Sequence, residues 1–301
     1  MIPATNWTIH PEVSTALKAG GAVVALESSL LARGTDWEAN LETAVALENE
    51  VRACGAVPAM CAIIDGMITV GLSTDEKARL AKSHGRAIKA SQRDIATLTA
   101  CGGTGVTTIA ATITIAHLAG IRVLSAGGFG GVHRGASQSF DVSNDLHALA
   151  NTPMTVVCSG IKSILDVGLT LEYLETLGVP VIGYGTDRLP GYYCRETRFS
   201  VDARIDEPSQ IARVLRASGA LGLRGGLLVC NPIPRHYALP EAELDQAIGQ
   251  ALEEARMDGI EGKAITPYLI ARLDELVAGT RQASVQLGLN NSRLASAIAA
   301  C

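Results

Sequence analysis

Two side chains stand where strand-like runs end and could act together as a nucleophile and a proton donor. Glu27 closes the apolar run 21–26, and Lys162 follows the apolar run 154–159. A lysine among apolar residues loses hydration, which disfavours its ammonium form and frees an amine that attacks carbonyl or anomeric carbons. A carboxyl group at an apolar mouth works as a general acid or base. The alternatives are a helix-start lysine that reaches water and a solvated or helix-capping glutamate.

A glycine-dense segment at 127–136 offers a possible anion site. Glycines let backbone amides approach a phosphate, and His133 or Arg134 could add a donor. The spacing matches neither a dinucleotide fingerprint nor a Walker A loop. Further along, Asp141 and Asp145 are predicted to face one way at a helix start, where their oxygens would suit Mg²⁺ or Mn²⁺. The spacing alone favours the alternative, in which an acidic helix start only satisfies the helix dipole.

A second segment rich in glycine and threonine, 102–108, precedes an apolar helical pattern. A helix start of this kind binds anions, and a sugar phosphate becomes a fitting ligand if Lys89 folds against it. On its own, the pattern is more typical of a plain loop before a buried helix.

The elements that would position these residues follow a strand–helix rhythm. Strand-like runs at 121–125, 154–159, 180–184 and 226–230 alternate with helical patterns at 143–151, 162–177 and 206–219. We therefore predict one α/β domain over residues 1–301, with a mostly parallel sheet covered on both faces and only helices from about residue 240. Ligands gather at the carboxyl ends of such strands, which selects four places. They are Glu27, the segment 127–139, Lys162 and Asn231.

Local patterns add detail. Asn40 is predicted to cap a helix that stops at Gly55. The dipeptide 65–66 (Asp-Gly) joins two apolar runs as a hairpin, and Ser73 opens a capping box. The stretch 95–121 carries no Asp, Glu, Lys or Arg, but glycines break it, so we expect two buried helical pieces and no membrane span.

Composition excludes several classes of function. Net charge is −5 and aromatic content is 4%, which disfavours a nucleic-acid partner but allows a small anion bound at a local site. The seven cysteines form no CxxC pair, which indicates reduced thiols. The N-terminus lacks the pattern of a signal peptide. We expect a cytoplasmic enzyme without a membrane partner.

Several longer strings are distinctive together, among them GGVHRGA at 130–136, KSILD at 162–166 and NPIP at 231–234. Further strings occur at 24–28, 55–59, 116–123, 170–176, 181–186, 262–267 and 290–291. In this order they resemble the pseudouridine-5′-phosphate glycosidase family, also described as indigoidine-synthase-A-like, over roughly residues 8–298. The resemblance implies a three-layer α/β/α sandwich and a homotrimer.

The resemblance also implies roles for single residues. Lys162 matches the lysine that forms an imine-type adduct with ring-opened ribose 5-phosphate, and Glu27 matches the acid/base carboxylate. Asp141 matches a ligand of Mn²⁺, which the family holds mainly through water. The implied substrate-binding residues are Lys89, Thr108 and Ile109 at the phosphate, His133 at the sugar, Ser143, Asn144 and Asp145 in a further binding segment, and Ser284 at the base.

The run 27–40 and position 284 depart from the family pattern. Arg33 stands where the family has histidine, Asp36 and Glu38 replace two prolines, and Ser284 replaces the asparagine that addresses the base. Trp37 lies in the same altered run and is a candidate stacking face for the aglycone.

These departures leave two functions open. The favoured one is hydrolysis of pseudouridine 5′-phosphate to uracil and ribose 5-phosphate. The alternative is a C-glycoside synthase of secondary metabolism that joins ribose 5-phosphate to another planar aglycone. A catalytically inactive sugar-phosphate binder is disfavoured, because Lys162 and Glu27 are both present.

Overall fold

The computed structural model describes residues 6–33, 36–83, 86–260 and 262–301. Residues 34 and 35 of the altered run therefore lie outside the described part. One large sheet runs through the molecule, and its strands pair in parallel except where β3 meets β4 and β6. Its order is β1 (Trp7–Ile9), β4 (Met67–Val70), β3 (Val57–Ile64), β2 (Val23–Glu27), β7 (Val123–Ser125), β9 (Thr155–Cys158), β13 (Leu227–Cys230), β11 (Val181–Tyr184) and β12 (Ala203–Ile205), with β6 (Gly105–Thr107) and β5 (Ile88–Ala90) beside β3.

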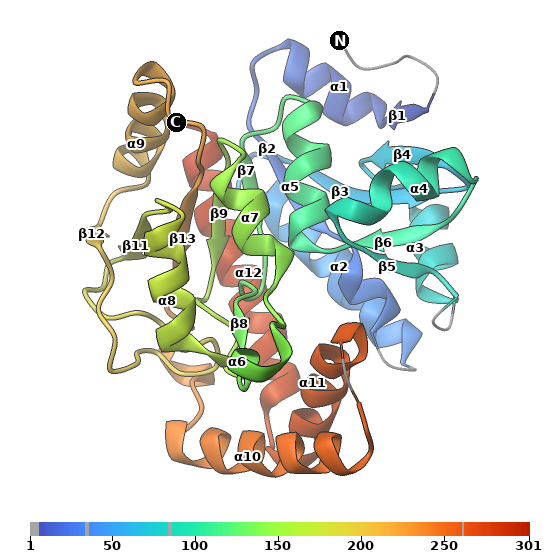
Figure 1. Ribbon diagram of the computed structural model, residues 1–301. Coiled ribbons are helices and arrows are strands. Elements are labelled where there is room, and N and C mark those ends of the chain that lie inside the picture. Colours follow the sequence, from blue (N-terminus) through green and yellow to red (C-terminus); the bar gives the residue numbers. More distant parts are fainter. Residues whose placement is uncertain (1–5, 34–35, 84–85, 261) are drawn as a thin grey trace.

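Helices cover both faces of the sheet (Figure 1). One layer holds α2 (Trp37–Ala53), α9 (Pro208–Ala220) and α12 (Thr280–Ala299); the other holds α1 (Pro11–Lys18), α5 (Ile109–Leu118), α7 (Asn144–Ala150) and α8 (Val167–Thr176). Neighbouring residues of β2 show the alternation, because Val24 packs with Leu294 of α12 while Ala25 belongs to the cluster of Ile113 in α5. The predicted three-layer sandwich with a mostly parallel sheet is confirmed.

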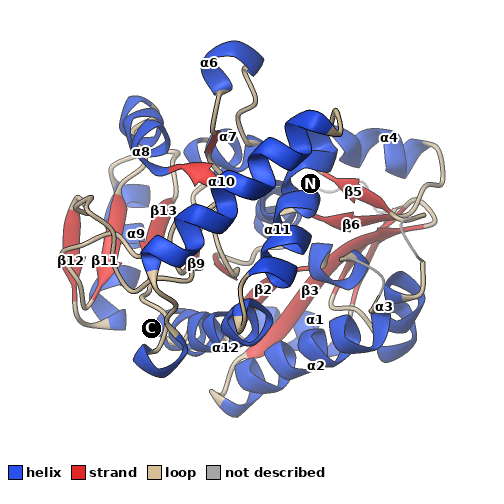
Figure 2. Ribbon diagram, turned by 90° about the horizontal axis from the view of Figure 1, so that it is seen from below, coloured by secondary structure: helices blue, strands red, loops and turns tan. Residues whose placement is uncertain are grey.

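The predicted C-terminal helices are also present. Helices α10 (Glu241–Met257) and α11 (Ile265–Leu276) form a hairpin at the end of the molecule where β8 (Val132–His133) and α6 (Ala136–Ser139) lie (Figures 1 and 2). This is the carboxyl end of the parallel strands. The hairpin therefore lies over the edge at which sequence placed the chemistry.

Several local predictions are confirmed. Residues 65 and 66 turn the β3–β4 hairpin with positive φ angles of 50° and 79°, as a type I′ turn requires. Ser73 forms the capping box that opens α3 (Thr74–Ala81). The uncharged stretch contains α4 (Ile95–Ala100) and α5, with β6 between them, a strand that we did not predict. No helix in the described ranges combines the length and apolar run needed to cross a bilayer.

Two predicted helix starts are wrong. Helix α2 begins at Trp37, because Asp36 Oδ1 accepts the Ala39 amide at 3.1 Å and serves as the cap. Asn40 instead donates its Nδ2 to the Arg33 carbonyl. Helix α8 begins five residues after Lys162, because the Asp166 carboxylate caps it. Lys162 thus lies on a loop and is not a helix-start residue.

Candidate active site

Glu27 is the last residue of β2, and its carboxylate is half-buried at the carboxyl edge of the sheet. Ser29 Oγ donates a hydrogen bond to Glu27 Oε2 at 2.7 Å. Burial raises the pKa of Glu27 above its ordinary value of 4.5, and the charge of Lys162 and the bond from Ser29 oppose this only in part. Glu27 can therefore hold a proton at a pH where exposed glutamates are ionised, as its position predicted.

Lys162 is held by the loop that follows β9. Its backbone amide donates to the Phe129 carbonyl at 3.0 Å. The loop turns at Gly160, which has a φ of 91° and lies so close to the Pro190 carbonyl that no larger residue fits. A Cβ on Gly128 would lie 3.1 Å from Lys162 Cγ and 2.5 Å from a ring carbon of Tyr192. The bare glycine therefore lets the lysine stem and the tyrosine ring lie together.

Lys89 lies in β5, next to the start of α5. The Thr108 amide donates to the Ala90 carbonyl at 2.9 Å, Thr108 Oγ1 caps α5, and buried Ile109 is the first residue of that helix. Desolvation lowers the pKa of Lys89 below 10.5, and the charge of Lys162 lowers it further. Two amines and a helix start with its positive dipole end thus converge, which suits a phosphate.

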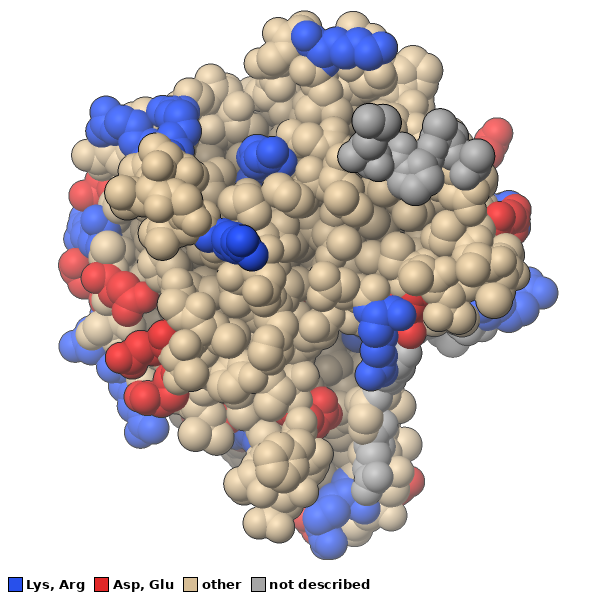
Figure 3. Space-filling view, turned by 45° about the horizontal axis from the view of Figure 1, so that its top comes forward, with Lys and Arg blue, Asp and Glu red and all other residues tan. Residues whose placement is uncertain are grey.

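This positive site is local. Figure 3, turned to bring forward the end opposite α10 and α11, shows a largely uncharged middle with basic and acidic side chains near one another along the edge. The formal net charge of the chain is −5. The arrangement fits a small anion rather than a polyanion.

His133 and Asp141 face each other beside these groups. Their Nε2 and Oδ2 atoms are 3.9 Å apart, and Thr266 Oγ1 of α11 is 3.5 Å from the same Nε2. Burial lowers the pKa of His133, the charges of Lys162 and Lys89 lower it as well, and Asp141 opposes them. A neutral imidazole can donate or accept a hydrogen bond with a sugar hydroxyl.

The prediction that Asp141 and Asp145 face one way on a helix is wrong. Helix α7 begins only at Asn144, so Asp141 lies before it in an irregular segment. Asp145 is 5% exposed, and its two oxygens accept the amides of Ala110 and Gly130 at 2.8 and 3.2 Å. Asp145 therefore joins α5, α7 and the glycine-dense segment, and its carboxylate is already engaged.

Several backbone amides of the glycine-dense segment are already engaged within the protein. The amides of Phe129, Gly130 and Val132 donate to protein acceptors. Arg134 donates to the Ser163 carbonyl at 3.2 Å and lies 3.5 Å from Asp245 of α10. The glycines instead allow close packing around the neighbouring side chains.

Gly130 makes this packing testable. A Cβ there would lie 2.2 Å from Ser143 Oγ and 2.6 Å from Asp145 Oδ2. We expect Gly130→Ala to lower the free energy of unfolding by about 1–3 kcal/mol in urea denaturation. Gly249→Ala is the control, because open space surrounds that site inside α10 and alanine there should add about 0.5–1 kcal/mol. Equal loss in both variants would contradict the packing described.

Ser143 and Asn144 begin α7 beside Lys89. Ser143 Oγ accepts the Asp145 amide at 3.3 Å, and Ser91 Oγ, just after β5, donates to Asn144 Oδ1 at 3.2 Å. These contacts hold the start of α7 against the strand of Lys89. The binding roles of these residues remain predictions.

Ser284 and Arg33 lie around a pair of tyrosines near Lys162. Tyr193 Oη is 3.0 Å from Ser284 Oγ, and the rings of Tyr192 and Tyr193 are 4.3 Å apart. Arg33 forms an ion pair with Asp274 of α11 at 2.9 Å. Desolvation opposes the charge of Arg33, but the two tyrosines and Asp274 outweigh it and raise the pKa of the Arg33 guanidinium.

Sequence reasoning missed the two tyrosines. Tyr192 has a φ of 66°, a strained conformation for a residue with a side chain, and its ring lies against the stem of Lys162. Both rings are almost fully buried. The only signal was the dipeptide itself in a chain poor in aromatic residues. Trp37, predicted as a stacking face, packs with the cluster of Leu31 and Leu80 and carries Lys82 over its ring at 4.6 Å.

Asn231, the fourth candidate after a strand, is part of a buried network. Its Nδ2 donates to Asn291 Oδ1 at 3.1 Å, and Asn291 Nδ2 donates to the Ala126 carbonyl at 2.9 Å. Ser159 Oγ also donates to Asn291 Oδ1. These bonds tie α12 to the carboxyl ends of three strands, so Asn231 positions the edge of the sheet.

Comparison with known proteins agrees with this arrangement. The model of the family "Indigoidine synthase A like protein" matches residues 12–301. The chain is 51% identical over 294 residues to pseudouridine-5′-phosphate glycosidase 2 of Photorhabdus laumondii, covering 97% of this chain and 94% of that protein. It is 50% identical over 292 residues to the pseudouridine-5′-phosphate glycosidase of Escherichia coli, covering 97% and 94%.

A solved structure matches over the same length. The prealnumycin C-glycosynthase AlnA, in complex with ribulose 5-phosphate, superposes with a TM-score of 0.90 and 41% identity, covering 99% of this chain and 97% of that one. The chain therefore belongs to the indigoidine synthase A-like family of enzymes, as the strings in its sequence indicate.

Proposed function

We propose that the chain is a pseudouridine-5′-phosphate glycosidase, which cleaves the C–C bond between ribose 5-phosphate and uracil through an adduct on Lys162. One observation carries the proposal: Lys162, half-buried Glu27 and Lys89 converge at one edge of the sheet, each close enough to shift the pKa of a neighbour. The relatives at about half identity over the full chain support uracil as the leaving base.

The chemistry needs an amine because a carbon leaving group is poor. In our scheme the Lys162 amine attacks C1′, and the C1′–O4′ bond breaks as O4′ takes the proton that the attacking amine loses. The C1′–C5 bond then breaks, its electron pair passes into the uracil ring, and Glu27 protonates C5. The remaining C1′=N imine adds water, which releases ribose 5-phosphate and restores the amine. Run in reverse, an electron-rich carbon attacks the imine.

The other residues bind and orient the substrate. Lys89, Thr108 and Ile109 at the start of α5 receive the phosphate, and neutral His133 contacts a sugar hydroxyl. Ser143, Asn144 and Asp145 form the segment behind the sugar, with Asp145 acting mainly through the backbone that it holds. Ser284 lies with the tyrosine pair at the base end.

Asp141 suits a divalent ion that retains most of the water molecules in its coordination shell. Its carboxylate is partly exposed and near His133, and no group of three or more His, Cys, Asp or Glu side chains in the described ranges forms a metal cage. We propose that Asp141 would hold a Mn²⁺ ion mainly through water, which would supply positive charge near the substrate.

We also propose a homotrimer, supported by an exposed aromatic residue on a projecting segment. Phe140 follows α6, is 86% exposed and has a φ of 54°. The left-handed backbone of Phe140 stores strain, which a contact with a neighbouring subunit would offset. Analytical ultracentrifugation tests the trimer: Phe140→Ser should shift the chain toward monomers, and a monomeric wild-type chain would exclude it.

The test of the function is incubation of the protein with pseudouridine 5′-phosphate and Mn²⁺, with uracil release followed by liquid chromatography. Equal amounts of uracil and ribose 5-phosphate are expected. Their absence, together with adduct formation from ribose 5-phosphate, would exclude the glycosidase and retain the lysine chemistry.

Arg33 supports the second candidate, C-glycoside synthesis with another planar aglycone. Its cation is fixed by Asp274 beside the tyrosine pair. A fixed guanidinium suits an aglycone with ring oxygens rather than an apolar one. The match to the C-glycosynthase AlnA agrees with such a role.

We expect Arg33→Met to raise KM for the base or aglycone by roughly tenfold, the loss of one charge-assisted hydrogen bond. Capture of ribose 5-phosphate by Lys162 should not change, since the charge of Arg33 is held by Asp274 and is assigned here to the aglycone. Condensation assays with uracil and with hydroxylated quinones measure the first effect, and intact-mass spectrometry measures the second. A variant that loses adduct formation as well would show that Arg33 does not act on the aglycone alone.

A further inference from the structure

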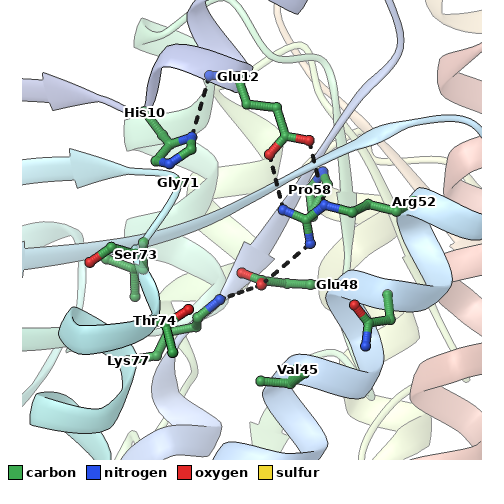
Figure 4. Close-up of a pocket in the computed structure, with 12 residues that line it drawn as sticks. His10, Glu12, Val45, Glu48, Arg52, Pro58, Gly71, Ser73, Thr74 and Lys77 are labelled. Carbon is green, nitrogen blue, oxygen red and sulfur yellow. Dashed lines mark hydrogen bonds and ion pairs between the residues drawn. The ribbon is translucent and has the colours of Figure 1, made fainter.

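Two of the concavities formed by the described residues lie outside the candidate active site. The first, about 380 Å³, lies between α1, α2 and α3 at the amino end of the sheet (Figure 4). Arg52 binds Glu12 at 3.0 Å and lies 3.7 Å from Glu48, and buried Lys77 also pairs with Glu48. The charges of this first concavity satisfy one another, so it has no need of a ligand.

The second concavity, about 460 Å³, lies at the carboxyl ends of β11 and β13. These strands are on the β12 side of the sheet, away from Glu27 on β2. Three segments contribute four arginines to the wall. They are Arg188 and Arg195 in the loop between β11 and β12, Arg204 in β12, and Arg235 after β13.

Among the residues that the structure describes, carboxylate partners are present for Arg204 but not for the other three. Arg204 Nε donates to Asp206 at 2.8 Å and its Nη1 to Asp187 at 3.1 Å. Arg188 donates to the carbonyl of residue 198 at 3.0 Å, and Arg195 to the carbonyl of residue 233 at 2.6 Å. A carbonyl accepts the hydrogen bond but leaves the positive charge uncompensated.

Arg235 lacks even that contact. No hydrogen bond or ion pair of its side chain occurs within the described ranges, and the side chain is exposed. Desolvation lowers the pKa of Arg195, and the charge of Arg235 lowers it further. The charge of Glu196 opposes both effects. The two cations therefore repel each other across one hollow. The wall carries four arginines against two acids, Asp187 and Glu196, which leaves an excess of positive charge.

We propose that this arginine-lined hollow is a second, noncatalytic binding site for a phosphoryl group, either free phosphate or pyrophosphate or the phosphate of a small metabolite. Guanidinium forks bind phosphate oxygens in pairs, and an anion relieves the repulsion between Arg195 and Arg235. A volume of about 460 Å³ lies within the range of small-molecule sites.

The experiment is isothermal titration calorimetry of the full chain with inorganic pyrophosphate. All titrations use chains that carry Lys89→Ala, which removes one amine of the proposed catalytic phosphate site. Binding of pyrophosphate to the arginine-lined hollow is then measured separately from binding at the catalytic site. In that background we expect pyrophosphate to bind, and Arg195→Gln with Arg235→Gln to weaken binding by at least about tenfold. Arg235→Gln alone, at an exposed side chain without partners, should give part of this loss without a risk to folding.

The matched control removes two charges elsewhere. Arg213→Gln with Arg224→Gln changes exposed arginines of α9 and the loop after it, and affinity should stay as in the background. The proposal is overturned if pyrophosphate does not bind in the Lys89→Ala background, or if the hollow and control pairs weaken binding equally. Because no step requires Lys162, a failed glycosidase assay leaves this outcome unaffected.

Discussion

Lys162→Ala is expected to abolish both uracil release and the covalent capture of ribose 5-phosphate. The amine is the nucleophile of the proposed reaction, and no other amine shares its loop beside Gly128 and Tyr192 in the described ranges. Turnover should fall on the order of 10⁴-fold or more, the scale seen when a covalent catalyst is removed. Uracil release measures turnover, and intact-mass spectrometry after borohydride reduction measures the adduct.

Lys18→Ala is the control, because Lys18 is exposed in the last turn of α1 and lies far along the chain from the site. This variant should match the wild type in both assays. If Lys162→Ala keeps a borohydride-stable adduct, another nucleophile captures the sugar and the proposed mechanism is wrong.

Glu27→Gln should separate the two steps. Loss of a positioned general acid lowers turnover by roughly 10²–10⁴-fold. Capture of free ribose 5-phosphate, whose open-chain form already presents an aldehyde, should persist. Ser29→Ala tests the assignment without removal of the carboxyl, because the bond from Ser29 lowers the pKa of Glu27. The alkaline limit of the cleavage rate should then move to higher pH; an unchanged limit would exclude Glu27 as the proton donor.

The raised pKa of Glu27 also predicts how the stability of the Glu27→Gln variant should change with pH. Because burial raises the folded-state pKa of Glu27 above 4.5, protonation of this group stabilises the fold below pH 4.5, and that contribution is lost as pH rises through the folded-state value. Glu27→Gln should therefore melt like the wild type below pH 4.5 and at a higher temperature above the raised pKa. Calorimetry across this range measures the difference. A lower melting temperature at neutral pH would mean that the ionised carboxylate stabilises the fold.

The sequence predicted the parts of the site that depend on general geometry. The carboxyl ends of parallel strands meet at one edge, so the residues after two apolar runs, Glu27 and Lys162, had to lie near each other once the sheet was parallel. The hairpin and the capping box follow from local turn chemistry. The start of α5 was an anion candidate because glycines and threonines precede an apolar helix.

The rest depends on contacts that no local pattern contains. The prediction that Asp141 and Asp145 share one helix face was wrong because α7 begins at Asn144, three residues after Asp141. The spacing argument needed the helix to begin at Asp141. Strand β6 was hidden in a segment of glycine and threonine that pairs only because β3 offers a free edge. The Arg33–Asp274 pair joins residues 241 positions apart, through the hairpin of α10 and α11.

The most direct test of the central claim is peptide mapping of the enzyme quenched with borohydride during turnover of pseudouridine 5′-phosphate. The mechanism predicts a ribose-phosphate adduct on the peptide that contains Lys162, formed while uracil accumulates, and a stronger adduct signal when added ribose 5-phosphate slows product release. Uracil accumulation with no adduct on that peptide would contradict the mechanism.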